Sequence, residues 1–382
     1  MSFNVGDPGH TAEHNRLAVV PPGLVLDGVT DNAATINATL AASLDRIVDL
    51  PSGPIAVSEP IVHTGRRWLR GAGTSFNGSA VTTLVPTADF AGDALIISTV
   101  EQGFYWHAGI ISDLAVKMHP TAQQDPADYT VDANGIHIHQ MGENSLLRNV
   151  YVMNAKKAGV LLTGTHAVGT IEMCSAWSCG GYGIKFTQEP EIAGNGGTVR
   201  VYGFSGDGNR PGLVYVDGGH QLDLSGIKYE TYISGDPGPI VVGGTSSGGG
   251  RAKLNITGSR FAGDGGVGSI VTIPSTAKPS IVLAACHGVG WANIIDDQGS
   301  DVQVAGGNPP ALLVYGSDGN DRADFYVQNG RLPLNSDVPG RFRHQGASLG
   351  FYGATATTRP TGVAVTAEGI HAALVSLGLI IA

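Results

Sequence analysis

The chain has 382 residues, a net charge of −10 and 57 glycines, whereas aromatic residues make up 7% and charged residues 14%. The acidic balance excludes a nucleic-acid-binding protein that works through a basic surface, and no apolar run is long enough to cross a bilayer. The N-terminus lacks a basic and then apolar signal segment, so export by the ordinary secretory route is not expected. A hydrophobic content of 42% opposes disorder, and abundant glycine favours a fold with many tight corners.

Residues 1–26 precede the first regular element and are predicted to form a separate N-terminal segment. They contain His10, Glu13 and His14, which are residue types that bind zinc. Pro8 and Gly9 precede the first histidine, and nothing places the two imidazoles on one face of a helix. We therefore expect no metal site here and no cofactor elsewhere in the chain.

A helix is predicted over residues 26–44, because Asp31 or Thr30 can cap it and its apolar residues form one stripe. The stripe consists of Ala33, Ile36, Leu40 and Leu44. Residues 46–73 then predict three short strands joined by Pro-Ser-Gly and Thr-Gly turns.

Three ordered motifs in this region resemble the opening of pectate-lyase-like right-handed β-helix proteins. They are DGVTDNAATINATL (27–40), VDLPSGPIAVSEPIV (48–62) and WLRGAG (68–73). In that family the helix covers the first coil of the solenoid, whose open end would otherwise invite strand addition. The resemblance implies the same role for the predicted helix.

A repeat in the middle of the chain predicts the same architecture independently. Residues 145–164 and 170–188 share one pattern, in which positions recur after 24 residues. Strands that begin with glycine then follow at intervals of 24, 24, 29, 26 and 30 residues. They are GIHIHQ (135–140), GVLLTG (159–164), GIKFTQ (183–188), GLVYVDG (212–218), GPIVVGG (238–244) and GSIVTIP (268–274). Such spacing without helical periodicity predicts an all-β parallel β-helix, with coils from about residue 81 to about residue 304.

The coils carry one long polar insertion, at residues 119–134, which we predict to be a loop that leaves the body and contacts a partner. The periodicity is lost after residue 307. Residues 366–380 then predict a helix whose single apolar stripe needs a partner. The expected domains are therefore 1–26, 27–307 for the β-helix, and 308–382 for a small C-terminal tip of strands and one helix.

Both ends of the chain resemble tail proteins of phages that infect actinobacteria. The matching stretches are GDPGHTAEHN (6–15) and GFYGATATTRPTG (350–362). This resemblance implies a phage tail fibre or tailspike, a family that is commonly a homotrimer of parallel β-helices. It also implies a virion tail location, attachment to other tail or baseplate proteins through residues 1–26, and host cell-envelope glycan as the external partner.

Charged residues line up when the repeats are aligned on the outward position of the first strand. This row is predicted to read Arg148, Glu172, Arg200, Asp223 and Asn255. One interpretation is an exposed ladder of ion pairs, each contributing little. The other is catalytic, because Glu172 and Asp223 would lie roughly 9 to 10 Å apart, near the upper separation for an inverting glycosidase. Arg200 between them would lower both carboxyl pKa values, which suits a lyase better.

A second group of residues is predicted to line a sugar-binding groove, because aromatic rings stack on apolar sugar faces and carboxylates accept hydroxyl hydrogen bonds. The group consists of Glu189, Glu191, Tyr202, Tyr215, Tyr229, Glu230 and Tyr232. The alternative is that these tyrosines are scattered over strands, where tyrosine is common. His137 and His139 share a strand face but have no third ligand in sight, so no metal is expected there.

These observations favour a tail fibre or tailspike that attaches to host surface glycans. A polysaccharide depolymerase, either hydrolase or lyase, is the alternative, because the fold alone does not separate the two.

Overall fold

The computed structural model describes residues 18–74, 81–99, 108–119, 128–164, 168–187, 198–217, 219–230, 237–243, 252–263, 268–273, 280–284, 286–289, 293–297, 303–304, 348–349, 357–358 and 366–376. The chain divides into two compact units, Met1–Tyr326 and Val327–Ala382, each of which is described by itself. The predicted domain boundaries at residues 26 and 307 remain predictions.

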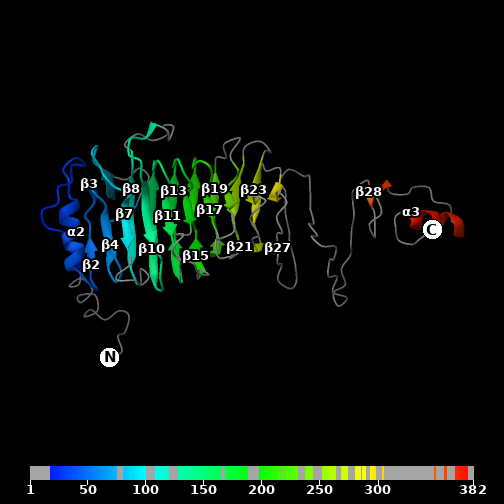
Figure 1. The fold of residues 1–382 in the computed structure, drawn as a ribbon, viewed down its shortest axis with the longest axis horizontal. Coiled ribbons are helices and arrows are strands. Elements are labelled where there is room, and N and C mark those ends of the chain that lie inside the picture. Colours follow the sequence, from blue (N-terminus) through cyan, green and yellow to red (C-terminus); the bar gives the residue numbers. More distant parts are fainter. Residues whose placement is uncertain are drawn as a thin grey trace, which may run out of the picture. The chain divides into compact units, whose positions relative to one another are not determined.

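The first unit is a parallel β-helix, as predicted, in which each turn of the chain passes through three faces (Figure 1). The first face contains β1 (Ala18–Val19), β2 (Ile47–Asp49), β5 (Trp68–Arg70), the start of β8 (Ile110–Lys117), the start of β10 (Ser145–Met153), β12 (Gly169–Glu172), β15 (Thr198–Tyr202), β18 (Gln221–Ser225), β21 (Lys253–Thr257), β24 (Ser280–Ala284) and β27 (Gln303–Val304). Every pair of neighbouring strands on this face is parallel.

The second face contains β3 (Gly53–Val57), β6 (Thr82–Pro86), the ends of β8 and β10, β13 (Ser175–Trp177), β16 (Ser205–Asp207), β19 (Lys228–Glu230), β22 (Arg260–Ala262) and β25 (His287–Val289). Because β8 and β10 run through the corner between them, the first two faces form one 18-stranded sheet.

The third face is a separate 9-stranded sheet. It contains β4 (Ile61–Thr64), β7 (Ala94–Thr99), β9 (Asn134–His139), β11 (Val160–Thr163), β14 (Ile184–Thr187), β17 (Val214–Val216), β20 (Ile240–Val242), β23 (Ser269–Ile273) and β26 (Asn293–Asp297). The predicted glycine-led strands are therefore one face of the solenoid.

The repeat folds in this way because alternate residues of each strand point into one continuous apolar core. In β10 the buried residues Leu147, Val150 and Val152 belong to this core. The inward alternation shifts across Asn149, which turns the corner with a left-handed backbone (φ 50°) that asparagine tolerates. The Asn149 side-chain amide donates a hydrogen bond to Asp113 Oδ1 of the preceding coil at 2.8 Å.

The helix α2 (Ala33–Ala42) lies at the end of the coil stack, where Figure 1 shows it beside β2 and β4. Ala33, Ile36 and Leu40 are buried, as the stripe predicted. Leu44 is 43% exposed, because the helix ends before it at Ala42. Asp31 Oδ1 accepts hydrogen bonds from the backbone N–H groups of Ala33 (3.0 Å) and Ser58 (2.8 Å), which ties the helix start to a later turn.

Arg67 secures the other end of α2. Its Nε donates to the carbonyl oxygen of Leu40 at 2.6 Å, and Nη2 donates to that of Ala41 at 3.4 Å. The last carbonyls of a helix have no partner within the helix, and a cation there is favoured by the helix dipole. A residue of the second coil thus holds the covering helix in place.

One local expectation was wrong. Residues 46–73 form four strands, β2 to β5, and the stack begins with β1, which pairs with β2, rather than near residue 81. The insertion at 119–134 returns to the body within its described part, because Tyr129 is 1% exposed and its hydroxyl donates to the Ser178 carbonyl at 2.9 Å. Its middle, 120–127, lies outside the described residues.

In the second unit, β28 (Ser348–Leu349) pairs antiparallel with β29 (Thr357–Thr358), and α3 (Ala367–Ser376) forms within the predicted helix. Ile370 of its apolar stripe is 48% exposed. Among the described residues, no helix is both long and apolar enough to cross a membrane.

Candidate functional site

The predicted charged row on the first face is misaligned by two residues. Arg148 does pair in register with Glu172, and their Nε and Oε1 atoms are 4.0 Å apart. Glu172, however, pairs with Tyr202, whereas Arg200 pairs with Thr170 on one side and with Asp223 on the other. Arg200 therefore does not lie between the two carboxylates.

This register separates Glu172 and Asp223 by two strands and by two residues along the strand. With strands about 4.8 Å apart and a rise of about 3.3 Å per residue, the Cα atoms are about 12 Å apart. Inverting glycosidases hold their carboxyl groups about 6.5 to 9.5 Å apart. The register thus places the backbones of Glu172 and Asp223 farther apart than the single row predicted.

The residues of the predicted sugar groove lie on different faces. Tyr202 is on the first face and 40% exposed, Tyr215 is on the third, and Glu230 is on the second. Tyr229 points into the core and is fully buried, so it cannot touch a ligand. That assignment was wrong. Glu189, Glu191 and Tyr232 lie outside the described residues.

The second face carries an aromatic cluster on its outer surface, separate from the core. It consists of Ala115, Tyr151 and Met153, with Trp177 packed against them. The rings of Tyr151 and Trp177 meet edge to face, with centroids 5.9 Å apart. Tyr151 is 9% exposed, and Trp177 remains more accessible. The cluster therefore holds a half-buried indole in place against a neighbouring ring.

Two carboxylates continue the same outward row. Trp177 of β13 pairs in register with Asp207 of β16, and Asp207 pairs with Glu230 of β19. Neighbouring strands put the two acidic residues about 4.8 Å apart at the backbone. Glu230 Oε1 is 2.9 Å from Lys228 Nζ, so this region presents acceptors beside a cation.

Hydroxyl groups occupy the parallel outward row. Ser175 and Ser205 share a hydrogen bond between their Oγ atoms at 2.7 Å. Burial, and secondarily the charge of Asp207, raise the pKa of the Tyr151 hydroxyl, which stays protonated at neutral pH. A half-buried indole beside carboxylates and hydroxyls matches the needs of a sugar, whose ring has an apolar face and a rim of hydroxyl groups.

Sequence reasoning missed Trp177, and it named Asp207 and Glu230 among the carboxylates near the tyrosines without predicting that they are register partners. The alternation that marks these outward positions is visible in the sequence, because SAW (175–177), SGD (205–207) and KYE (228–230) each place a small or apolar residue between two outward residues.

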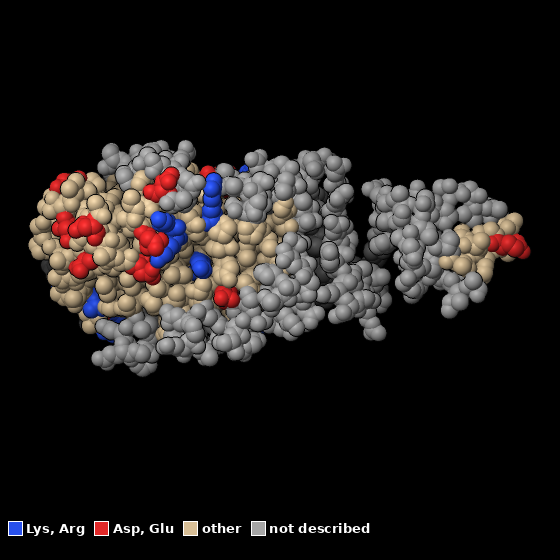
Figure 2. All heavy atoms as spheres, turned by 45° about the horizontal axis from the view of Figure 1, so that its top comes forward, with Lys and Arg blue, Asp and Glu red and all other residues tan. Residues whose placement is uncertain are grey.

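On the face drawn in Figure 2, the described charged residues include acidic groups toward the end that carries α2 and groups of both signs near the middle.

On the third face, His137 and His139 lie with ring centroids 3.9 Å apart. Thr163 Oγ1 is within hydrogen-bond distance of His137 Nε2 (2.9 Å) and of His139 Nδ1 (3.1 Å). Nowhere in the described parts of the chain do three or more His, Cys, Asp or Glu side chains gather in a way that would hold a metal ion.

Several solved structures are similar to this chain. The tailspike of phage phiAB6, solved in complex with three-repeated oligosaccharides of Acinetobacter baumannii surface polysaccharide, matches with a TM-score of 0.51 and 13% identity over 73% of this chain. The chain has a tailspike-like β-helix fold. ORF18 of Geobacillus virus E2 matches 79% of the chain with a TM-score of 0.48 and 14% identity. The gp42 tailspike of Acinetobacter phage vb_AbaP_AS12 matches 87% of it with a TM-score of 0.44 and 11% identity.

The matched stretch is 47% of the phiAB6 tailspike chain, 63% of the Geobacillus virus chain and 68% of the AS12 tailspike chain. The tailspike-like chain thus spans about half the length of the first of these proteins. No protein-family model matches the sequence, and a search of curated proteins gives no match.

Proposed function

We propose that the protein is a tail fibre or tailspike subunit of a phage and attaches to host cell-surface glycans through its second face. The observation that carries this proposal is the outward row Trp177, Asp207, Glu230 beside Tyr151. The fold supports it, because a protein with the same architecture has been solved with bound surface-polysaccharide fragments. The resemblance of both chain ends to tail proteins of actinobacterial phages supports a location in the virion tail.

The same proposal assigns roles to the two ends of the chain. Residues 1–26 would join other tail or baseplate proteins, and the C-terminal unit would hold a homotrimer together through α3. The exposed Ile370 on that helix supports a contact with other copies. Light scattering of the purified full chain should give the mass of a trimer, and a monomer at all concentrations would exclude the fibre arrangement.

The binding proposal is tested by titrating purified protein against a panel of bacterial envelope polysaccharides. A polysaccharide that binds wild type should bind Trp177→Ala and Asp207→Asn at least about tenfold more weakly, a loss of about 1.4 kcal/mol each. Lys253→Ala is the matched control, because Lys253 is an exposed strand residue on the first face. An equal loss of affinity in all three variants, or no loss in any of them, would contradict a binding site on the second face.

The alternative function is glycan cleavage, and one feature favours it. Asp207 and Glu230 are register partners, and the strand spacing of about 4.8 Å is close to the carboxyl separation of about 5 to 5.5 Å in retaining glycosidases. A depolymerase would release reducing ends or unsaturated uronates from envelope glycans. Glu230→Gln should then abolish release, whereas Glu172→Gln combined with Asp223→Asn should leave it intact. Absence of products with every binding polysaccharide would leave attachment alone.

A further inference from the structure

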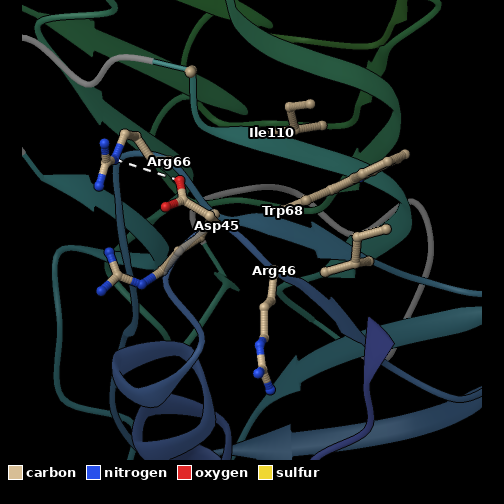
Figure 3. A pocket seen from close by; sticks show the side chains of 8 residues that line it. Asp45, Arg46, Arg66, Trp68 and Ile110 are labelled. Carbon is tan, nitrogen blue, oxygen red and sulfur yellow. Dashed lines mark ion pairs between the residues drawn. The ribbon is translucent and has the colours of Figure 1, made fainter. Parts of the chain in front are cut away.

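A hollow of about 290 Å³ lies at the corner where the third face turns into the first, in the coils nearest α2 (Figure 3). Its lining residues are Asp45, Arg46, Ile47, Arg66, Arg67, Trp68, Ala108 and Ile110. Figure 3 shows the pair of Asp45 and Arg66 on one side, and Trp68 with Ile110 on the other. The smallest pockets that bind small molecules have a volume of roughly 300 Å³, and this hollow is close to that size.

The charged side of the hollow has an excess of positive groups. Three arginines and one aspartate line it, and Arg67 is already bound to the carbonyl groups at the end of α2. Arg66 Nε is 3.5 Å from Asp45 Oδ1, and these side chains are 55% and 63% exposed. An exposed ion pair of this kind is weak and is easily exchanged for a ligand. Arg66 is therefore available to an anion in a protein whose net charge is −10, whereas the Arg46 side chain points away from the pair in Figure 3.

The other side of the hollow is flat and apolar. Ile47, Trp68 and Ile110 are register partners in three successive coils and form one outward row. The Trp68 indole N–H donates to Ser112 Oγ at 2.7 Å, which fixes the ring. The Cζ atoms of Arg70 and Arg148 lie 5.2 and 6.0 Å from the ring centroid. These cations cover part of the indole, and the part that lines the hollow is fixed in place and can contact the apolar face of a sugar ring.

The backbone at this corner has the same conformation in successive coils. Asp45, Arg66, Ala108 and Asn144 turn the same corner in successive coils, all with left-handed backbones (φ between 49° and 59°). Asparagine, aspartate and glycine adopt this conformation at little cost, but arginine does not. Ala108 has the same conformation in this corner, so the corner itself imposes it, and it sets the position from which the Arg66 side chain starts.

We propose that this hollow binds a sugar unit that carries an anionic group, either a carboxylate or a phosphate. The sugar ring lies against Trp68, and the anion pairs with the guanidinium group of Arg66 in place of Asp45. The site is distinct from the second face and would give the protein a preference for acidic glycans. It does not depend on the residues assigned to attachment above, so the two proposals fail separately.

The test titrates the full chain with three probes, an oligogalacturonate, the corresponding neutral galactose oligosaccharide and galactose 6-phosphate, and follows binding by ligand-observed NMR. At least one acidic probe should bind, at least tenfold more tightly than the neutral one, and the stronger acidic probe identifies the anionic group. Inorganic phosphate should bind more weakly than either acidic sugar that binds. Binding of all sugars alike, or of none, overturns the proposal, and so does phosphate binding as tightly as the sugars.

Two variants separate a binding role from a structural one. Arg66→Gly should lower the affinity for the acidic probe at least tenfold without lowering the melting temperature, because glycine relieves the strained backbone. Asp45→Asn should raise that affinity, since it removes a competing carboxylate while asparagine keeps the same backbone. Arg260→Gln, an exposed arginine on the second face, is the control and should change neither quantity. Unchanged affinity in Arg66→Gly, or a large fall in its melting temperature, contradicts the assignment.

Discussion

The first and second faces are built from the same turns of the chain and close over the same core, yet their outer surfaces have different chemistry. Near α2 the first face presents Trp68 beside Arg70 and Arg148. The second face presents Trp177 beside Asp207 and Glu230. The core fixes only the inward residue of each alternating pair, so the outward residues are free to differ from face to face. Function in such a solenoid is therefore decided by the outward rows.

The largest expected effect separates inward from outward positions on one strand. Phe186 of β14 is fully buried, and Lys185 beside it points outward. Phe186→Ala should lower the free energy of unfolding by about 3 to 5 kcal/mol, because it leaves a cavity in a packed core. Lys185→Ala should change it by no more than about 0.5 kcal/mol. Urea unfolding followed by circular dichroism measures both, and equal effects would contradict the alternation.

The next effect comes from two histidines inside the coils. Burial, followed for His63 by the nearby charge of Arg67, lowers the pKa of His63 and of His220 to about 4. An unfolded histidine has a pKa of about 6.5, so between these values the unfolded state binds more protons. Stability should therefore be full above about pH 6.5 and should fall as the pH drops toward 4, by on the order of 3 kcal/mol for each histidine.

This pH dependence is measured by urea unfolding between pH 7.5 and 4.5. His220→Gln should reduce the loss of stability across that range, whatever it does at neutral pH. His371→Gln is the matched control, because His371 is exposed on α3 in the second unit. If the free energy of unfolding of His220→Gln falls with pH as steeply as that of the wild type, then the His220 imidazole of the wild type is not buried in the neutral form.

A smaller effect is expected at the covering helix. Arg67→Leu removes the donors to Leu40 and Ala41, and hydrogen bonds from charged groups contribute about 1.5 to 3 kcal/mol. Hydrogen exchange should show faster opening of residues 33–42 than of the coils. Arg200→Leu, an exposed arginine on the first face, should leave the helix unchanged. Equally faster hydrogen exchange in α2 and in the coils of the first unit would show that the helix and the coils unfold together.

The smallest effect is expected on the outer surface of the first face. Arg148 and Glu172 are 40% and 34% exposed and 4.0 Å apart. Arg148→Ala should change the free energy of unfolding by less than about 1 kcal/mol, since exposed ion pairs contribute little. A larger loss in thermal unfolding would show that the outer rows also hold the coils together.

The inward pattern could be predicted from sequence, whereas the outward neighbours could not. Buried apolar residues recur in every coil, so the alternation in 145–164 and 170–188 predicted the β-helix whatever the period. The step from Glu172 to its partner Tyr202 is 30 residues, whereas the sequence alignment assumed a shorter step to Arg200. The period changes between β14 and β15, so the prediction failed at that one step, whereas Arg148 with Glu172, and Arg200 with Asp223, are register partners as predicted.

Tyr229 was predicted to point outward and is another example of an error in side-chain direction. Lys228 and Glu230 on either side of it are outward, and this alternation marks the tyrosine as inward. Because tyrosine is common both in strands and in sugar sites, residue type alone misplaced it. The helix α2 was predicted from its apolar stripe, which is a local signal, but its cap residue is Asn32 rather than Asp31 or Thr30, and Leu44 lies beyond its end.

The central claim is that the second face attaches the particle to its host, and adsorption of phage to host cells tests it most directly. Purified wild-type protein should block adsorption in proportion to its concentration, and a variant carrying both Trp177→Ala and Asp207→Asn should not. Equal blocking by the two proteins, at equal folded concentration, would contradict the account.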